Sequence, residues 1–378
     1  MPIYFDNAAT SPLRKEVIDS INKVLLDTYG NPSSNHSFGR KAKTLIENSR
    51  KIISSLFNVS SQEIIFTSGG TESDNMLLRS AVEDLNVKTI ISTKIEHHAI
   101  LHALDYLEKK NVSIVYLPVD KKGEFKYNDL EQALSFDDSK KLVSLMHVNN
   151  EIGNMIDLEY ISKMCQSREA LLHTDAVQSV GHYKIDLNKI KVDFLSAAAH
   201  KFHGPKGVGF SFVRKNSGLN PFIFGGSQEM GLRAGTESVH NIVGMSKALE
   251  LAYKNLEEES KYIRSLKTYA ISKIKEFFPE AHFNGNCDKD DKSAYNLINV
   301  NLPISSDKKD LFDFHLDLKG IACSKGSACQ SGSAKGSHVL DLVVPNELKN
   351  RPSLRFSFSS FNSKGEIDFL IDTIREFI

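Results

Sequence analysis

The sequence has few cysteines, no excess of charge and no long apolar run. It contains no tryptophan, and its four cysteines (Cys165, Cys287, Cys323 and Cys329) are too scattered for a disulfide framework and lack zinc-site spacing. Lys plus Arg and Asp plus Glu both number 47, so the formal net charge is zero. This balance argues against nucleic acid or an anionic membrane as the main partner.

The apolar runs are all shorter than a membrane span, and the first residues lack the basic start and apolar core of a signal peptide. We therefore expect a cytoplasmic protein in a reducing compartment, with no bound metal and no membrane partner. In such a protein an important cysteine is catalytic rather than structural. A length of 378 residues, 40% of them hydrophobic, predicts more than one domain.

Short apolar runs alternate with helical patterns over the first two thirds of the chain. This alternation predicts an α/β fold with a mainly parallel sheet. The predicted strands are 63–67, 88–92, 112–117, 142–148, 170–174, 193–197 and 207–213, with helices at 13–28 and 40–57. Between Glu237 and about Phe278 the pattern is helical and predicts two long helices.

The last third has a different pattern. Residues 296–300 and 354–358 alternate as half-buried strands do, and helices are expected near 307–318 and 365–378. We predict a large domain over 15–255 and a smaller α+β domain over 256–378 together with 1–14. The segment 321–337 is rich in Ser, Gly, Ala and Lys and is expected to be a mobile loop.

Lys201 is the most informative residue. It lies in the segment His200–Gly209, which contains a Gly-Pro-Lys-Gly turn, and Asp175 and Gln178 end an apolar run before it. A lysine amine with a lowered pKa forms a Schiff base with an aldehyde. Pyridoxal phosphate is the usual aldehyde, and its ring nitrogen needs an acidic partner, for which Asp175 is the candidate. A solvated surface lysine is the alternative, which this sequence context disfavours.

Gly70 and Thr71 follow an apolar strand and open a helical stretch. Backbone amides at such a turn can bind a phosphate, helped by the positive end of the helix dipole. The alternative is an ordinary helix-capping turn. The motif alone leaves both interpretations open.

Polar residues follow three further apolar runs. His97 stands at a strand-to-helix junction, where an imidazole could stack on a heterocyclic cofactor and move protons, or could simply start the helix. Asn150, in Asn149–Gly153, and the pair Asp175 and Gln178 end runs whose carboxyl ends face the ligand crevice of a parallel sheet. Turn chemistry explains Asn150 equally well.

Two loops complete the set. Gly225–Thr236 holds four glycines and ends in Thr236, which indicates close approach to a ligand or to another subunit, or only a helix cap at Thr236. Cys329 lies among small residues, so its thiol is expected to be exposed and reactive. The other three cysteines are expected to be buried and inert.

Taken in order, these segments resemble the cysteine desulfurases, which are class V aminotransferases of the fold-type-I pyridoxal phosphate superfamily. The resemblance spans almost the whole chain and implies a large domain with a mainly parallel seven-stranded sheet plus a smaller α+β domain. The resembling segments are Tyr4–Thr10, Gly30–Ser34, Thr67–Thr71, Glu96-His97, Asn149–Gly153, His173–Gly181, His200–Gly209, Gly225–Thr236, Gly326–Cys329 and Leu354–Ser357.

The resemblance also implies roles around the cofactor, pyridoxal 5'-phosphate. Lys201 holds it and removes the substrate's α-proton, His97 stacks on its ring, and Asp175 pairs with the ring nitrogen. The remaining cofactor contacts are Gln178 and Asn150 at the phenolic oxygen and Gly70, Thr71 and His200 at the phosphate. Thr236 is expected to contact the phosphate of a partner subunit, which implies a homodimer.

For the substrate L-cysteine, the resemblance implies that Arg355 binds the carboxylate, with Asn150 and Asn31 nearby. Cys329 takes the sulfur as a persulfide, L-alanine leaves, and the sulfur passes to an acceptor or scaffold protein in iron–sulfur cluster assembly or tRNA thiolation. One departure stands out, because relatives usually have serine on the phosphate where this chain has Ala198. We expect one phosphate hydrogen bond fewer.

Three other functions are compatible with the fold. A selenocysteine lyase would share all these residues. A class V aminotransferase would need no thiol, so Cys329 argues against it. A non-enzymatic subunit that keeps only the fold is disfavoured because Lys201, Asp175, His97 and Arg355 are all present beside that cysteine.

Overall fold

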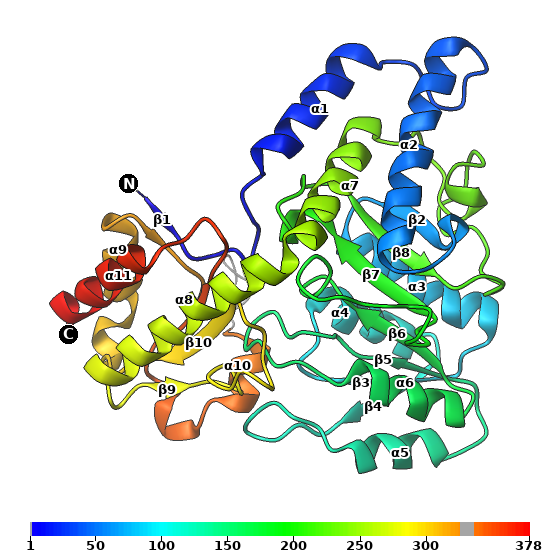
Figure 1. Ribbon diagram of the computed structural model, residues 1–378. Helices are drawn as coiled ribbons and strands as arrows, with labels where there is room; N and C mark the ends of the chain where they lie inside the picture. The colour runs from blue at the N-terminus through cyan, green and yellow to red at the C-terminus, as the bar shows by residue number, and fades with distance from the viewer. Residues whose placement is uncertain (1, 326–335) are drawn as a thin grey trace.

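The computed structural model of the chain describes residues 2–325 and 336–378, and within them the protein has two halves (Figure 1). The larger half is built on a seven-stranded sheet. Strand β8 runs antiparallel to both of its neighbours, and the other pairings are parallel. In spatial order the strands are β2 (Ile64–Thr67), β8 (Gly209–Val213), β7 (Phe194–Ala198), β6 (Leu171–Asp175), β5 (Lys141–Ser144), β3 (Thr89–Thr93) and β4 (Ser113–Leu117).

Helices cover both faces of this sheet, so its central strands are buried on both sides, as expected for a largely parallel sheet. Neighbouring residues of β3 belong to different hydrophobic cores. Ile91 belongs to the core that includes residues of α2, α6 and α7, and Ile90 belongs to the core that includes residues of α3 and α4. The helices are α1 (Lys15–Asp27), α2 (Ser37–Leu56), α3 (Gly70–Leu85), α4 (His98–Glu108), α5 (Tyr127–Ser135), α6 (Leu158–Ser167) and α7 (Val239–Lys254).

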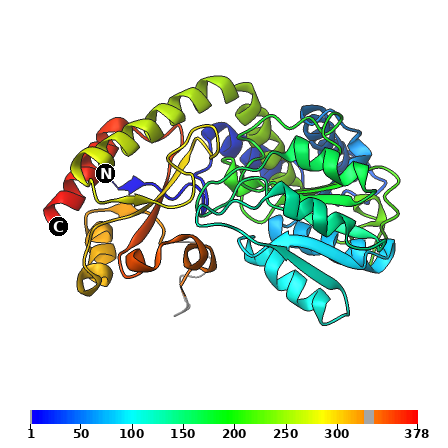
Figure 2. The ribbon, with the colours of Figure 1, turned by 90° about the horizontal axis from the view of Figure 1, so that it is seen from below.

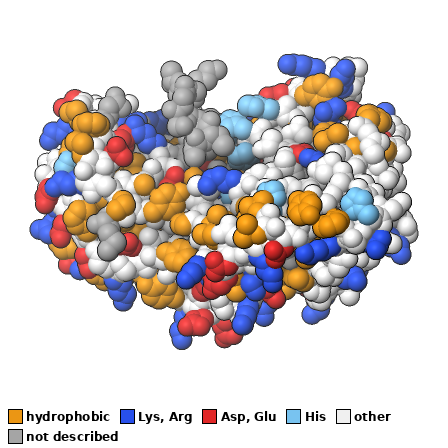
Figure 3. Space-filling model, turned by 90° about the horizontal axis from the view of Figure 1, so that it is seen from above, with side chains coloured by type: hydrophobic (Ala, Val, Ile, Leu, Met, Phe, Trp, Pro, Cys, Tyr) orange, Lys and Arg blue, Asp and Glu red, His pale blue; other side chains and the backbone are white. Residues whose placement is uncertain are grey.

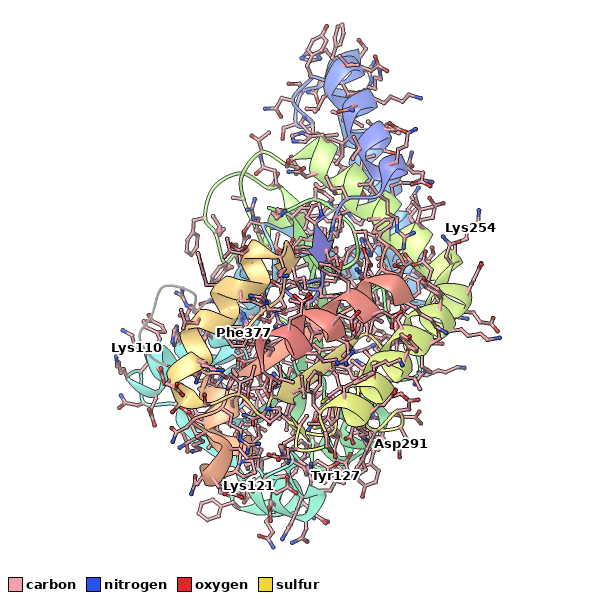
Figure 4. The ribbon with its side chains drawn as sticks, turned by 90° about the vertical axis from the view of Figure 1, so that its left-hand side faces the viewer. Lys110, Lys121, Tyr127, Lys254, Asp291 and Phe377 are labelled. Carbon is pink, nitrogen blue, oxygen red and sulfur yellow. The ribbon has the colours of Figure 1, made fainter. Side chains whose placement is uncertain are left out.

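The smaller half has an antiparallel sheet of β12 (Ser353–Ser357), β10 (Leu297–Asn301) and β9 (His282–Phe283), and a parallel pair of β1 (Ile3–Tyr4) and β11 (Ile321–Ala322). Its helices are α8 (Leu256–Phe277), α9 (Lys309–Leu318), α10 (His338–Val343) and α11 (Lys364–Phe377). Figure 4 shows α8 and α11 lying side by side over the sheet, in agreement with their contacts. Their apolar faces bury Ile263, Leu266 and Ile374.

The chain passes between the halves twice. Ile3 and Phe5 belong to the smaller core, whereas Val17 and Val24 belong to the larger one. Helices α7 and α8 meet at Asn255, where the chain leaves the large sheet (Figure 2). The domain limits given above stay a prediction. In the described part of the chain, no helix combines the length and the apolar character needed to cross a membrane.

Each predicted strand of the large sheet has a counterpart in the structure. Two predictions need correction, the end of one of these strands and the start of the loop predicted over 321–337. Strand β5 ends at Ser144 and not at 148. Beyond it the amide of His147 still donates to Asp175 of β6, but the amide of Met146 donates to the Glu96 carboxylate at 2.8 Å. The predicted loop 321–337 begins as strand β11, and Ser324 bridges to Arg355. Backbone pairing with β1 and Arg355 thus outweighs the loop-like composition. Cys329 lies outside the described residues.

Candidate active site

A cavity of about 160 Å³ lies at the carboxyl ends of β6 and β7, between the two halves of the molecule. Residues from the N-terminal segment, the large sheet and β12 contribute to its walls. The lining contains nine of the residues singled out from the sequence, namely Gly70, Thr71, His97, Asn150, Asp175, Gln178, His200, Lys201 and Arg355. It also contains Ala8, Ala9, Asp74, Met146, Val148, Val177 and Ala198.

Lys201 ends a short 3-10 turn, η2 (Ala199–Lys201), that follows β7 directly. Its Nζ donates hydrogen bonds to the carbonyl oxygens of Ala8 at 2.6 Å and Ala9 at 2.9 Å. The N-terminal segment therefore folds over the end of β7 and holds the amine at the cavity. Asp175 ends the neighbouring strand β6, in register with Ser196 of β7. The amine and the carboxyl consequently lie at the same edge of the sheet.

Three carboxyl groups are buried beside this cavity. Burial raises the pKa of Asp175 to about 7, with a further rise from the nearby Asp74 carboxyl. Burial also raises the pKa of Asp74 to about 7 and that of Glu96 to about 8. Asp74 was missed in the sequence. The only signal for it is its place one helical turn after Gly70, which puts both on the same face of α3.

The two histidines that line the cavity, His97 and His200, are neutral near pH 7. His97 caps α4, and its Nδ1 accepts a hydrogen bond from the amide of Ala99 at 3.1 Å, so a neutral ring carries its proton on Nε2. Burial, together with the charge on Lys201, lowers the pKa of His97 to about 4, and the same two causes lower the pKa of His200 to about 4. A neutral imidazole suits stacking on an aromatic ring.

These shifts predict how the stability of the cofactor-free protein depends on pH. Five histidines with pKa values near 4 (His97, His147, His173, His200 and His203) bind protons mainly on unfolding, so acidification from about pH 6.5 to 4 destabilises the fold. The three carboxyls hold protons mainly when folded, so their contribution to stability falls as the pH rises from about 4 to 8, and above about pH 6.5 the histidines no longer offset this fall.

We expect a maximum in the free energy of unfolding near pH 6.5. Urea unfolding between pH 5 and 8.5 measures it directly. A curve that keeps rising between pH 6.5 and 8.5 would contradict the buried, protonated carboxyls.

The turn before α3 has the features of an anion site. Gly69, the N-cap residue, supplies no side-chain hydrogen bond, so the first amides of a 16-residue helix lack a side-chain cap. A Cβ at Gly70 would lie 2.7 Å from Cγ2 of Val177, so this position needs glycine. Ala198 lines the cavity beside it with a methyl group in place of a hydroxyl.

Arg355 is almost fully buried on β12 and joins the two halves. Its guanidinium donates to the carbonyl oxygen of Asn150 at 2.7 Å and to Oδ1 of Asp6 at 2.9 Å. Its Nε, also buried, has no hydrogen-bond partner among the described residues. Because guanidinium carries five donors, Arg355 retains donors for an anionic ligand in the cavity. Gln178 is held nearby by a 2.8 Å bond from its Nε2 to the Ala8 carbonyl.

Two residues singled out from the sequence do not line the cavity of this chain. Asn31 is exposed, and its side chain accepts a hydrogen bond from the amide of Ser33 at 2.9 Å. Thr236 is exposed at the end of its loop. A buried pair of Arg50 and Glu229 at 2.7 Å ties this loop to α2, and the amide of Phe66 in β2 donates to the same Glu229 carboxylate at 2.6 Å. The roles predicted for Asn31 and Thr236 stay predictions.

Figure 3 shows histidine side chains at the surface in the hollow between the two halves. His98 stacks near His102, with ring centroids 4.9 Å apart, and near His338 at 4.5 Å. Within residues 2–325 and 336–378 no group of His, Cys, Asp and Glu has the arrangement of a metal site.

The chain matches the family described as Aminotransferase class-V over residues 3–370. It belongs to that family. The cysteine desulfurase IscS of Dictyoglomus turgidum is 41% identical over all of this chain and 94% of its own length, and that of Methanosarcina thermophila is 38% identical over all of this chain and 92% of its own. A NifS-like protein of known structure has a TM-score of 0.90 at 35% identity, with 100% of this chain and 99% of that chain covered.

These similarities confirm the fold class expected for a fold-type-I pyridoxal phosphate enzyme. The NifS-like protein from Rickettsia africae superimposes with a TM-score of 0.88 at 30% identity, over 100% of this chain and 99% of its own. Class V aminotransferases use pyridoxal phosphate, so membership implies that cofactor here.

Proposed function

We propose that this class V protein is a cysteine desulfurase, which converts L-cysteine to L-alanine and passes the sulfur to Cys329 and then to an acceptor. The observation that carries the proposal is the convergence of Lys201, Asp175 and Arg355 on one cavity. An amine, a buried acid and a guanidinium are what an aldehyde cofactor and an amino acid substrate require. Relatives up to 41% identical that span the whole chain bear this enzyme name.

The cavity residues fit pyridoxal phosphate. The amine of Lys201 suits the aldehyde, the buried Asp175 suits the ring nitrogen, and the flat neutral ring of His97 suits stacking. The start of α3 at Gly70 and Thr71 suits the phosphate, because its first amides have no side-chain cap. His200 lines the same cavity, and Gln178 and Asn150 supply amides for the phenolic oxygen.

When bound, the cofactor supplies an electron sink for the negative charge that develops at the substrate's Cα. Lys201 Nζ accepts the proton from Cα, since the amine already lies at the cavity beside Ala8 and Ala9. Asp175, as a carboxylate, keeps a proton on the ring nitrogen. Arg355 orients the substrate by its carboxylate, and its bond to Asn150 fixes the guanidinium relative to the large sheet.

Cys329 is the proposed sulfur acceptor. The other three thiols do not compete with it. Cys165 and Cys287 are buried as expected, whereas Cys323 is partly exposed, contrary to the expectation from the sequence. Desolvation raises the pKa of Cys165 to about 12, of Cys287 to about 11 and of Cys323 to about 12. We further propose a cytoplasmic homodimer in which Thr236 contacts the cofactor phosphate of the partner subunit. The sulfur would serve iron–sulfur cluster assembly or tRNA thiolation.

An assay with pyridoxal phosphate and a reductant tests this function. We expect equal amounts of alanine and sulfide from L-cysteine, with absorbance typical of a lysine-bound cofactor. Selenocysteine run in parallel distinguishes a selenocysteine lyase, and transamination without sulfide would replace the proposal with a class V aminotransferase.

Ala198→Ser should strengthen cofactor binding. The residue lines the cavity beside Gly70, so a hydroxyl there could donate to the phosphate, a charged group worth about 1.5–3 kcal/mol per hydrogen bond. We expect roughly tenfold or more lower Kd for pyridoxal phosphate, measured by fluorescence titration of the cofactor-free protein. An unchanged Kd would show that the missing hydroxyl does not weaken the site.

A further inference from the structure

Asp74 is a second carboxyl in the cofactor cavity to which the mechanism above gives no role. It lies in the second turn of α3, with a relative exposure of 1%. Its Oδ1 has no hydrogen-bond partner among the described residues and lies 3.5 Å from Nε2 of His173. In the described part of the chain, the Ser196 hydroxyl is the one hydrogen-bond partner that lowers the pKa of Asp74, and this effect is smaller than that of burial, which raises it. An acid with so little compensation is costly to bury in ionised form.

No cation balances Asp74 in the described residues around it. His173 is fully buried between the hydroxyls of Ser144 at 2.9 Å and Ser196 at 3.2 Å, and burial lowers its pKa to about 4. The other titratable groups facing this region are the carboxyls of Asp175 and Glu96, which repel a charge on Asp74, and Lys201, which faces Asp175. Two neighbouring carboxyls in such a site do not both ionise readily.

The position on α3 sets which of the two acids is ionised with cofactor bound. Asp74 lies four residues, about 6 Å along the helix axis, beyond Gly70, where the phosphate is proposed to bind. A dianionic phosphate there disfavours a charge on Asp74. Asp175 instead faces the cationic ring nitrogen, which favours its ionised form.

We propose that Asp74 and Asp175, which line the same cavity, act as a carboxyl pair of which only one member is ionised, and that Asp74 stays protonated when pyridoxal phosphate binds. The inference rests on the proposed cofactor site. Asp74 then acts as a positioning residue, because its neutral form lets phosphate and ring nitrogen bind on either side without repulsion. Above pH 7, where Asp74 in the empty site loses its proton, cofactor binding must take up a proton from solvent.

Asp74 and Asp175 have opposite effects on the way cofactor affinity depends on pH. The pKa of Asp175 falls on binding, so its contribution favours affinity as pH rises toward 7. The pKa of Asp74 rises on binding, so its contribution weakens affinity above about pH 7, by up to tenfold per pH unit. Asp74→Asn, whose amide imitates the neutral acid in shape, removes only the second contribution.

Titration calorimetry of the cofactor-free protein with pyridoxal phosphate tests this. The binding enthalpy is measured at pH 8 in two tertiary-amine buffers that differ in ionisation enthalpy. The difference between the two measured enthalpies gives the number of protons taken up on binding. We expect wild type to take up close to one more proton than D74N, and its Kd to rise with pH above 7 more steeply. The control E83Q, which alters an exposed carboxyl on the same helix, should match wild type.

The outcomes distinguish this inference from the proposed function. If wild type does not bind pyridoxal phosphate at all, the proposed function fails first. If wild type and D74N both bind with the same proton count, only the carboxyl pair is overturned. Should D74N not fold, infrared spectra of wild type with isotope-labelled aspartate decide, since the loaded protein must show a protonated aspartic acid at pH 7.5, and its absence overturns the inference.

Discussion

Lys201→Ala abolishes the release of alanine and sulfide from L-cysteine. The substitution removes the group proposed both to bind the cofactor aldehyde and to accept the Cα proton. Positioned proton transfer alone contributes about 10²–10⁴ in rate, so we expect kcat to fall by at least that factor. The cofactor absorbance should shift to that of free pyridoxal phosphate, because among the described residues that line the cavity Lys201 supplies the only lysine amine.

The control for this prediction is Lys206→Ala, a change five residues along the chain at an exposed position. It should leave kcat within about twofold of wild type, since surface substitutions rarely perturb stability or activity. Thermal unfolding of both variants checks that the Ala8 and Ala9 carbonyls tolerate loss of the Lys201 ammonium. A K201A protein that retained a tenth of wild-type activity would exclude Lys201 as the cofactor lysine.

Arg355→Lys raises KM for L-cysteine by about 10- to 150-fold. Lysine keeps the charge but cannot reproduce a planar fork that contacts Asn150, Asp6 and a substrate carboxylate together. The range corresponds to about 1.5–3 kcal/mol for one charge-assisted hydrogen bond. Steady-state kinetics over a wide range of L-cysteine concentrations measure it, and kcat should change less than KM.

Arg351→Lys is the matched control, because that arginine lies near the surface and pairs with Glu280 at 3.3 Å. It should behave as wild type. Cofactor affinity in R355K should also be unchanged, since none of the proposed phosphate contacts involves Arg355. If KM stayed within twofold of wild type, the substrate carboxylate would have to bind elsewhere.

The large sheet could be predicted from the sequence because its strands are short apolar runs separated by helical patterns. Their order in space was not predictable from those patterns. Cavity residues such as Asp175 and Lys201 could be found because Asp175 ends β6, Lys201 ends the turn after β7, and the carboxyl ends of parallel strands meet at one edge. The resemblance to a known family supplied their individual roles.

Other features depend on contacts between distant segments. Strand β11 has a loop-like context, and only its pairing with β1, more than 300 residues earlier, makes it a strand. In the sequence Asp74 has the pattern of an ordinary polar helix residue. It is buried only because α3 packs against β6 and β7. The pattern of apolar and polar residues within one segment contains no information about the distant segments that it will contact. The roles predicted for Asn31 and Thr236 stay predictions, because neither residue lines the cavity of this chain.

The central claim is that cofactor and sulfur chemistry meet at Lys201 and Cys329. Peptide mass spectrometry tests it most directly, after incubation with pyridoxal phosphate and L-cysteine and reduction of one portion with borohydride. The account predicts a reduced cofactor adduct on Lys201 in the borohydride-treated portion and one added sulfur on Cys329 in the untreated portion. An adduct on a different lysine, or added sulfur only on cysteines other than Cys329, would contradict it.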